Sequence, residues 1–315
     1  MPTLHAFGEL LIDALPGPPV EGQPSLVLHA GGAPANVACQ YARLGGRGRV
    51  IGGISRDPLG QWLKQQASSF GVDCSGLVEV DNPTAMAIVS LTSAGERSFT
   101  FHRHGTADLA LRRTQIDLDA LKPGDILHFC SNTLTEKGAA ETTLALAETA
   151  RELGLLISFD VNLRPGLWAS GEPDFALVAK ALTRCHLVKM AQEELDWYSR
   201  HAKKSAQQIA DAEGLVLIVT DGPAPIQVYR PDLPSLSLIP PRVQAVDTTG
   251  AGDSFCGALL WILGQSGDIH GSLAAFEDDS FVQETLGFAA ACAARTCQGR
   301  GAMAAMPGAD FLGQI

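Results

Sequence analysis

Aromatic and charged residues are scarce in this chain of 315 residues. Aromatic side chains make up 6% of it and charged ones 18%, against 46% hydrophobic residues, so we expect a sizeable core that is mostly aliphatic and rich in alanine. The formal net charge is −11 and no basic block offsets it, which makes nucleic acid and anionic membranes unexpected partners. A small anionic ligand is still compatible with this charge, because arginines and backbone dipoles act at short range.

Paired cysteines, a leader sequence and membrane-length apolar runs are absent from the sequence as well. The seven cysteines are scattered, lack a C-x2-C pair and lie mostly in apolar contexts, as the reduced core thiols of a cytosolic protein do. No basic region followed by an apolar run is present at the N-terminus. No apolar run approaches the roughly eighteen residues needed to span a bilayer. We therefore expect a cytoplasmic protein.

Short apolar strands alternate regularly with amphipathic helices in the second half of the chain. Strands are expected at 126–129, 155–159, 187–190 and 215–220, with helices at 139–153, 175–183 and 206–213 between them. This alternation predicts right-handed βαβ crossovers and a mainly parallel sheet, in which ligands gather at the carboxyl ends of the strands. The residues expected at such ends are Asp13 (after a first strand over 5–12), the 160–164 loop, Lys189, Thr220 and Asp247.

Two extended runs break this rhythm. They cover 85–92 and 98–102 and are joined by a hairpin turn from Ser93 to Glu96. Together with the segment 16–29, which has a glycine- and proline-rich start, they predict a small antiparallel sheet that projects from the body as a lid, formed roughly by 13–30 and 85–105. Such a sheet has edges that need covering, so we expect a homodimer through the lid.

The run from Val246 to Phe255, V-D-T-T-G-A-G-D-S-F, carries the strongest functional signal. It follows a proline-punctuated strand region over 236–243 and opens into an apolar stretch with helical spacing. The predicted feature is a strand-to-helix turn with two glycines and an acid, Asp253, in the first helical turn. Unpaired N–H groups and the dipole at a helix start form an anion hole, which glycine lets a ligand approach closely. A carboxylate beside such a hole suits phosphoryl transfer to a hydroxyl, with the acid taking the proton.

The same turn is compatible with plainer roles than phosphoryl transfer. In the plainest of them, Asp253 supports a helix N-terminus and the glycines only turn the chain. The sequence has no Gly-Lys dipeptide, and hence no Gly-x4-Gly-Lys-Ser/Thr phosphate loop. Phe255 stands where the dinucleotide-binding fingerprint needs its third glycine. A hydrolase nucleophile at Ser254 is disfavoured, because no Gly-x-Ser-x-Gly elbow surrounds it.

Two motifs far apart in the chain resemble the signatures of one family. Ala30 to Ala38, A-G-G-A-P-A-N-V-A, resembles the N-terminal signature of the ribokinase-like (PfkB) carbohydrate kinases, and Asp247 to Phe255 resembles their C-terminal signature. The resemblance covers nearly the whole chain. It implies an α/β fold, namely a three-layer sandwich with a mainly parallel central sheet and a small antiparallel β-sheet lid, in a single kinase domain over 1–315.

Within that family, the stretches 95–103 and 160–168 are most similar to fructokinases, and kinases of 2-keto-3-deoxygluconate are similar there too. Three places depart from the fructokinase pattern: Val161 in place of Pro, Ala191 in place of a polar residue, and Pro223 and Pro225 where a second glycine is expected.

The resemblance implies a role for each residue of these motifs. Asp253 would be the general base, and Gly250, Ala251 and Gly252 would stabilise charge on the transferring γ-phosphoryl group. The residues that would hold or close over the sugar are Asp13, Gly31, Gly32, Asn36, Arg103 and Arg164. The nucleotide site would be lined by Lys189, Thr220 and Gly222. Glu194 would hold Mg²⁺ through water, and Asp247 and Thr249 would border a monovalent-cation site, with K⁺ as the expected ion.

The implied activity is that of an ATP-dependent sugar kinase acting on a primary hydroxyl of D-fructose, with fructose 6-phosphate as the expected product. A 2-keto-3-deoxygluconate kinase stays open, because Arg103 and Arg164 would suit its substrate carboxylate. The same two arginines could equally be surface ion-pair partners. Another PfkB sugar or nucleoside kinase and a non-catalytic sugar-binding sensor complete the alternatives. A pure sensor has no need of a proton acceptor, so Asp253 argues against it.

Overall fold

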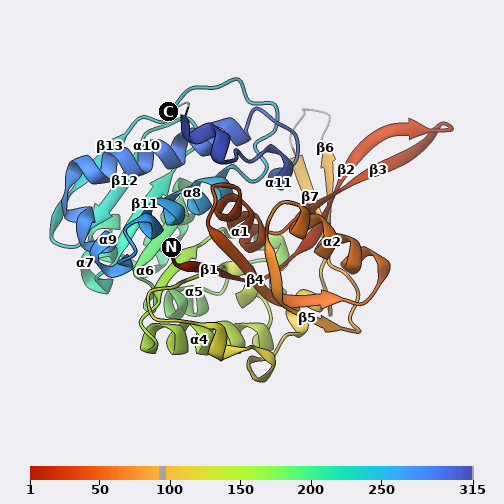
Figure 1. Cartoon of the computed structure of the whole chain (residues 1–315), viewed down its shortest axis with the longest axis horizontal. Coiled ribbons are helices and arrows are strands. Elements are labelled where there is room, and N and C mark those ends of the chain that lie inside the picture. The colour runs from red at the N-terminus through yellow and green to blue at the C-terminus, as the bar shows by residue number, and fades with distance from the viewer. Residues whose placement is uncertain (92–96, 314–315) are drawn as a thin grey trace.

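The computed structural model describes residues 1–91 and 97–313 (Figure 1). A nine-stranded sheet forms its centre, in the order β13-β12-β11-β10-β9-β8-β1-β4-β5. The mutually parallel strands are β1 (Thr3–Phe7), β4 (Arg47–Ser55), β5 (Asp73–Val80), β8 (Ile126–Cys130), β9 (Leu156–Asp160), β10 (Leu187–Ala191) and β11 (Val216–Thr220). Antiparallel strands β12 (Ile226–Arg230) and β13 (Leu233–Leu238) extend one edge. The predicted mainly parallel sheet is confirmed.

Helices cover both faces of this sheet, because apolar side chains of the strands point alternately to one face and to the other. Leu156 packs in one apolar cluster with α1, α8 and α10, whereas its neighbour Ile157 packs in another with α4 to α7, since successive side chains of a strand point to opposite faces. The result is the three-layer sandwich that was expected. The helix bounds are α1 Ala33–Arg43, α2 Pro58–Ser69, α3 Ala107–Ala110, α4 Lys137–Glu152, α5 Phe175–Leu182, α6 Gln192–Ala202, α7 Ala206–Glu213, α8 Ala251–Gln265, α9 Ile269–Ala274, α10 Asp279–Thr296 and α11 Ala302–Ala305.

A search of the described residues finds no helix with the length and apolar character needed to cross a membrane.

The second sheet has four strands in the order β3-β2-β6-β7. They are β2 (Leu11–Val20), β3 (Gln23–Gly31), β6 (Met86–Leu91) and β7 (Arg97–His102). The predicted small sheet is thus confirmed; its outer pairs are antiparallel and its inner pair, β2 with β6, is parallel. The predicted turn from Ser93 to Glu96 lies outside the described residues. We call this sheet the lid.

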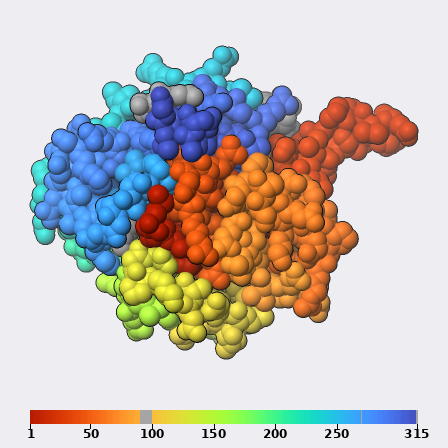
Figure 2. Space-filling model, viewed as in Figure 1, coloured from red at the N-terminus to blue at the C-terminus, as the bar shows by residue number. Residues whose placement is uncertain are grey.

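The β2–β3 hairpin projects beyond the rest of the lid as an arm (Figures 1 and 2). Among residues 1–91 and 97–313, strand β6 pairs with Ile12 to Ala14 of β2, and the remaining part of β2 pairs with β3 alone. The glycine- and proline-rich stretch that begins at residue 16 is itself strand, since β2 continues to Val20. A proline costs no ladder hydrogen bond where its nitrogen faces away from a partner strand.

The first strand also differs from its prediction. It was expected over 5–12 with Asp13 at its end, but β1 stops at Phe7, and Gly8 turns the chain with a φ of +148°. Asp13 therefore lies inside β2 of the lid. Asp247 is not at a strand end either, because β13 already ends at Leu238.

Candidate functional site

A cavity of about 690 Å³ lies between the lid and the carboxyl ends of the central strands. Three lining residues, Asp160, Ala191 and Thr220, are the last residues of β9, β10 and β11. Others come from the lid, from the start of α1 and from the start of α8. Two separate sheets and two helix N-termini thus meet at one place, which is where a parallel sheet is expected to bind its ligand.

The predicted strand-to-helix turn forms one wall of the cavity. Gly250 has a φ of +76°, in the left-handed region, and α8 begins at the next residue. The amide of Ala251 donates to the Thr248 carbonyl at 3.2 Å, whereas the amides of Gly252 and Asp253 have no acceptor within the part of the chain that the structure describes. The turn therefore offers two unpaired N–H groups at the positive end of a helix dipole.

Asp253 lies in this first turn and faces the cavity. Its Oδ2 accepts a hydrogen bond of 2.8 Å from Nδ2 of Asn36. Burial raises the pKa of Asp253 to about 7, and nearby Asp160 adds to the rise, while the Asn36 hydrogen bond, Lys189 and Arg164 oppose it. A carboxyl group with such a pKa can take a proton near neutral pH.

Asn36 lies within the first turn of α1 and is not the N-cap; Gly32 occupies that position. Its side chain is buried, the residue being 3% exposed, and reaches across to α8. The two helices can approach so closely because Gly257, one turn beyond Asp253, packs directly against Val37 and Gln40 of α1. A motif at the start of one helix is thereby brought to the acid at the start of another.

The glycines of the N-terminal motif make room for two acids. A Cβ on Gly31 would overlap with the Asp13 carboxylate, and a Cβ on Gly32 would overlap with the Glu9 carbonyl. Gly32 also has a φ of +111°. Burial raises the pKa of Asp13 to about 7, with Asp253 and Glu9 adding to the rise and Arg164 opposing it. The negative charge of Asp253 therefore adds to the proton affinity of Asp13.

Lys189 approaches the anion-hole turn. Its ammonium group lies 3.1 Å from Oδ1 of Asp160, and a Cβ on Gly252 would lie 3.1 Å from the same Nζ. Burial opposes the charged form, but Asp160, Cys256 and Glu194 together outweigh it and raise the pKa of Lys189, which therefore stays charged. Lys189 was predicted to line the nucleotide site; it lines the cavity, with its cation beside Gly252 of the turn.

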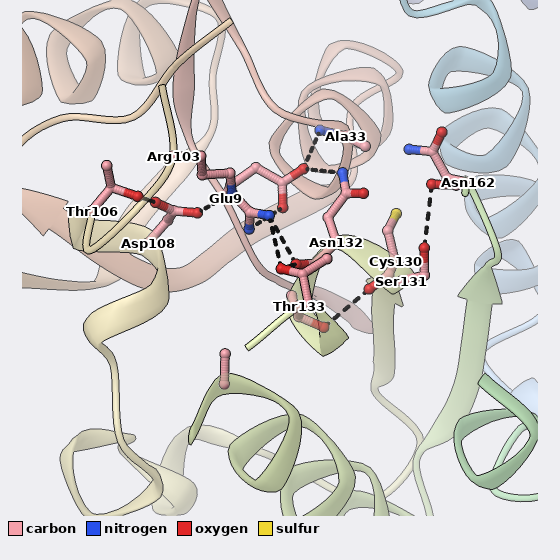
Figure 3. A network of polar contacts seen from close by, with 12 residues as sticks. Glu9, Ala33, Arg103, Thr106, Asp108, Cys130, Ser131, Asn132, Thr133 and Asn162 are labelled. Carbon is pink, nitrogen blue, oxygen red and sulfur yellow. Dashed lines mark hydrogen bonds and ion pairs between the residues drawn. The ribbon is translucent and has the colours of Figure 1, made fainter. Parts of the chain in front are cut away.

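Arg103 has a different setting from the one expected. It is 7% exposed, does not line the cavity, and is enclosed by two acids: Nε lies 2.6 Å from Asp108, and an η nitrogen lies 3.7 Å from Glu9. It also donates to the main-chain carbonyl of Asn132 at 2.9 Å. Figure 3 shows it between Asp108 on one side and Glu9 and Asn132 on the other. Arg103 thus joins the end of β7 to the body from behind the cavity wall.

Of the other predicted residues, Arg164, Glu194, Thr220 and Gly222 line the cavity, whereas Gly31 and Ala251 are not among its lining residues. Arg164 is exposed at its rim, and within the described residues no carboxylate lies at ion-pair distance from it. Thr220 and Gly222 follow β11 at the same edge. Glu194 is 4% exposed and caps α6, with one oxygen accepting from the Leu163 amide and the other from the Ala191 amide. Both oxygens keep a lone pair for water.

Asp247 lies behind the turn, 4% exposed. Its two oxygens accept from the amides of Thr249 and Gly301, so it ties the turn to the C-terminal segment. Across the described ranges, no three His, Cys, Asp or Glu side chains gather as metal ligands. A magnesium ion would therefore depend on phosphate oxygens and water besides any protein ligand.

Some polar residues that line the cavity were given no role from the sequence, among them Glu9 and Asn132. Asp160 and Asn162 belong to the 160–164 loop that was expected at a strand end. Glu9 follows the apolar strand β1, and this position was a usable signal. Asn132 lies in a short 3-10 turn, Ser131–Leu134, after β8. No motif marks it, and only the fold reveals its place.

Comparisons with known proteins agree with this geometry. A family model described as pfkB family carbohydrate kinase matches residues 1–309. Probable fructokinase-5 of Arabidopsis thaliana is 34% identical over 317 residues, covering 97% of this chain and 94% of that protein. The crystal structure of a fructokinase with bound ATP from Xylella fastidiosa matches with a TM-score of 0.91 and 35% identity, over 99% of this chain and 98% of that one. A fructokinase double mutant from Vibrio cholerae O395, in a form with bound fructose, ADP and potassium ion, matches with a TM-score of 0.87 and 31% identity, over 100% and 98% of the two chains.

Proposed function

The chain belongs to the pfkB family of carbohydrate kinases, which are phosphotransferases, and we propose that it transfers the γ-phosphoryl group of ATP to the C6 hydroxyl of D-fructose within one kinase domain. The product would be fructose 6-phosphate. One observation carries the proposal: the Asp253 carboxylate lies beside two unpaired amides at the start of α8. A proton acceptor and an anion hole are thereby within reach of the same reacting atoms.

Asp253 acts as the general base in this proposal. Asn36 donates to Oδ2 and fixes the carboxylate, so Oδ1 is left to take the hydroxyl proton as the sugar oxygen attacks phosphorus. The unpaired amides of Gly252 and Asp253 and the ammonium of Lys189 then stabilise the negative charge of the transferring phosphoryl group. Phosphoryl transfer depends mainly on such positioning and electrostatic stabilisation.

The charges around the cavity favour a neutral sugar over a sugar acid. Its lining holds two cations, Arg164 and Lys189, and seven carboxylates, which are Glu9, Asp13, Asp160, Glu193, Glu194, Asp221 and Asp253. Arg103, which would suit the carboxylate of 2-keto-3-deoxygluconate, is already enclosed by Asp108 and Glu9. A substrate carboxylate would meet acids at the sugar end of the cavity, and like charges at close range repel. Fructose has no such charge.

Asp13, Gly31, Gly32 and Asn36 would hold the sugar, and Arg164 would close over it from the rim. Thr220 and Gly222 would line the nucleotide site. When bound, Mg²⁺ would neutralise charge on the nucleotide phosphates, and Glu194 would hold it through water. Asp247 and Thr249 would border a K⁺ site, a proposal supported by the potassium in the Vibrio cholerae structure and by the tie between Asp247 and the anion-hole turn.

We also propose a cytoplasmic homodimer. The β2–β3 arm carries three exposed apolar residues, Val20 at 61%, Leu26 at 48% and Val27 at 43%. Apolar side chains on a projecting hairpin are a liability unless a partner covers them, and a second copy of the lid is one such partner.

A coupled ADP-release assay tests the substrate. Fructose, ribose, 2-keto-3-deoxygluconate and nucleosides would each be supplied with ATP, Mg²⁺ and K⁺, and fructose should give the highest kcat/KM. A higher kcat/KM for the sugar acid would overturn the argument from charge. Fructose binding measured by calorimetry without any ATP turnover would instead favour a non-catalytic sensor.

A further inference from the structure

Two asparagine side chains in the cavity each have a buried carbonyl oxygen without a hydrogen-bond partner among the described residues. They are Oδ1 of Asn36 and Oδ1 of Asn132, in residues that are 3% and 8% exposed. Both residues line the same cavity. A buried acceptor that meets no donor costs free energy, so such atoms in a cavity indicate a ligand that donates hydrogen bonds.

The orientation of the Asn132 amide is fixed by its surroundings. Nδ2 donates to Oε1 of Glu9 at 2.9 Å, and Glu9 is itself held in place because the same oxygen also accepts from the Ala33 amide at 3.2 Å. A flipped amide would put its oxygen against the Glu9 carboxylate. Oδ1 therefore stays directed away from Glu9, as Figure 3 shows.

Arg103 holds this arrangement from behind. It lies against Glu9, at 3.7 Å, and donates to the main-chain carbonyl of Asn132, at 2.9 Å. Side chain and main chain of Asn132 are thus both fixed by groups that are themselves buried and charged. A binding group positioned before its ligand arrives loses little entropy on binding, and such a group can discriminate between ligands.

We propose that Oδ1 of Asn132 accepts a hydrogen bond from a hydroxyl of the sugar and makes the kinase specific for sugars that carry this hydroxyl. The inference rests on the proposed function and adds a specificity residue to it. A hydroxyl is the donor of choice because the nearby acids Glu9 and Asp13 would disfavour a ligand carboxylate, which in any case donates nothing. A deoxy sugar would leave the Asn132 oxygen buried and unpaired.

This contact is tested by a double-mutant cycle in which one change is made in the enzyme and the other is the removal of a hydroxyl from the sugar. We would measure kcat/KM of the wild-type enzyme and of Asn132→Ala for fructose and for its 1-deoxy, 3-deoxy and 4-deoxy analogues. The wild type should lose roughly 10-fold to 100-fold on one analogue, as expected when a buried polar group is left unpaired. Asn132→Ala should show a similar loss on fructose, mainly in KM, but little further loss on that analogue.

Thr133→Val provides the matched control. Thr133 lies in the same turn and is as buried, but its hydroxyl donates to the Cys130 carbonyl and does not line the cavity. This variant should keep the wild-type order of the four sugars. Asn132→Ser is a second variant for the same cycle if Asn132→Ala does not fold, as judged by its melting temperature.

The results separate this inference from the proposed function. The inference would be overturned if Asn132→Ala lost as much kcat/KM on each of the three analogues, relative to wild type, as it loses on fructose. It would also be overturned if the wild-type enzyme used fructose and all three analogues equally well, and this measurement needs no variant. If the wild type phosphorylates another neutral sugar, the same cycle runs on the deoxy analogues of that sugar. If it phosphorylates no sugar at all, the proposed function fails and this inference fails with it.

Discussion

The side-chain amide of Asn36 donates a hydrogen bond of 2.8 Å to the carboxylate of Asp253, a residue 217 positions later in the chain. This contact joins the N-terminal and C-terminal motifs at one point of the cavity. It also leaves one oxygen of Asp253 for the substrate, so the base is oriented by the group that is proposed to hold the sugar.

Replacing Asp253 by Asn should lower kcat by roughly 10²-fold to 10⁴-fold, the usual contribution of a general base. The change keeps the size of the side chain and leaves the anion hole in place, so the KM for ATP should change little. Steady-state kinetics measure both quantities. Asp196→Asn, which alters an exposed acid on α6, is the control and should behave as wild type. A variant of Asp253 with near-normal turnover would exclude it as the base.

The activity should rise with pH through about 7. Asp253 must be deprotonated to accept a proton, and burial holds its pKa at about 7 in the free enzyme. A profile of kcat/KM between about pH 5.5 and 9 should therefore climb by roughly tenfold per unit on its acid side and level off above about pH 8. A flat profile across this range would show that no carboxyl group with a raised pKa controls the reaction.

The same raised pKa has the opposite effect on stability. The folded protein holds the Asp253 proton more tightly than the unfolded chain, so this contribution is complete below the unfolded pKa near 4 and is lost as pH rises through about 7. Asp253→Asn has no charge to bury and should melt at a higher temperature than wild type at about pH 8. The difference should shrink by about pH 5.5, which thermal unfolding at both pH values would check.

Gly257→Ala should disturb catalysis without touching the cavity. Its Cβ would lie 2.6 Å from Cβ of Gln40 and 2.7 Å from the Val37 carbonyl, so α1 must move away from α8. We expect a destabilisation of about 1–3 kcal/mol, as for overpacked cores, together with a lower kcat. Gly287→Ala in α10 is the control: nothing lies within 4 Å of its Cβ, and helix propensity predicts a gain of about 0.5–1 kcal/mol. Equal effects of the two changes on stability and kcat would contradict this account.

The sequence predicted about half of the residues that line this cavity, because its two motifs have local physical causes. Glycines, a helix start and an acid at fixed spacing predict the anion-hole turn wherever they occur, and β11 and α7 appeared close to their predicted places. Asp13 was misplaced, because the turn at Gly8 depends on a positive φ that an apolar run conceals. Arg103 and Asn132 could not be interpreted from sequence, since their partners come from three separate segments.

Replacing Arg103 by Met should destabilise the protein by about 3–5 kcal/mol, because Glu9 and Asp108 would remain buried without their cation. The surface pair of Arg47 with Asp73 provides the control. The Arg47 side chain is 68% exposed, and Arg47→Met should cost about 0–1 kcal/mol. Urea unfolding of both variants measures the difference. Similar losses in the free energy of unfolding would show that the buried ion pairs of Arg103 contribute no more to stability than the surface pair does.

Charging the arm should separate the proposed dimer. Val20→Asp combined with Leu26→Asp would place charges on its exposed apolar side chains, and light scattering at micromolar concentration should then report a monomer in place of a dimer. Ile239→Asp, at a residue that is 74% exposed and lies outside the lid, should leave the mass unchanged. A wild-type protein that is already monomeric would contradict the proposed dimer.

The Arg103 cluster fixes the root of the lid, where β7 ends, to the main body. Because one end of the lid is held in place, any displacement of the lid relative to the body would increase with distance from that end. The end of β7 would then keep its position relative to Glu9 and Asn132, while parts of the lid farther from Arg103 are displaced more. The proposed contact between Asn132 and the sugar would therefore be independent of the position of the outer strands of the lid.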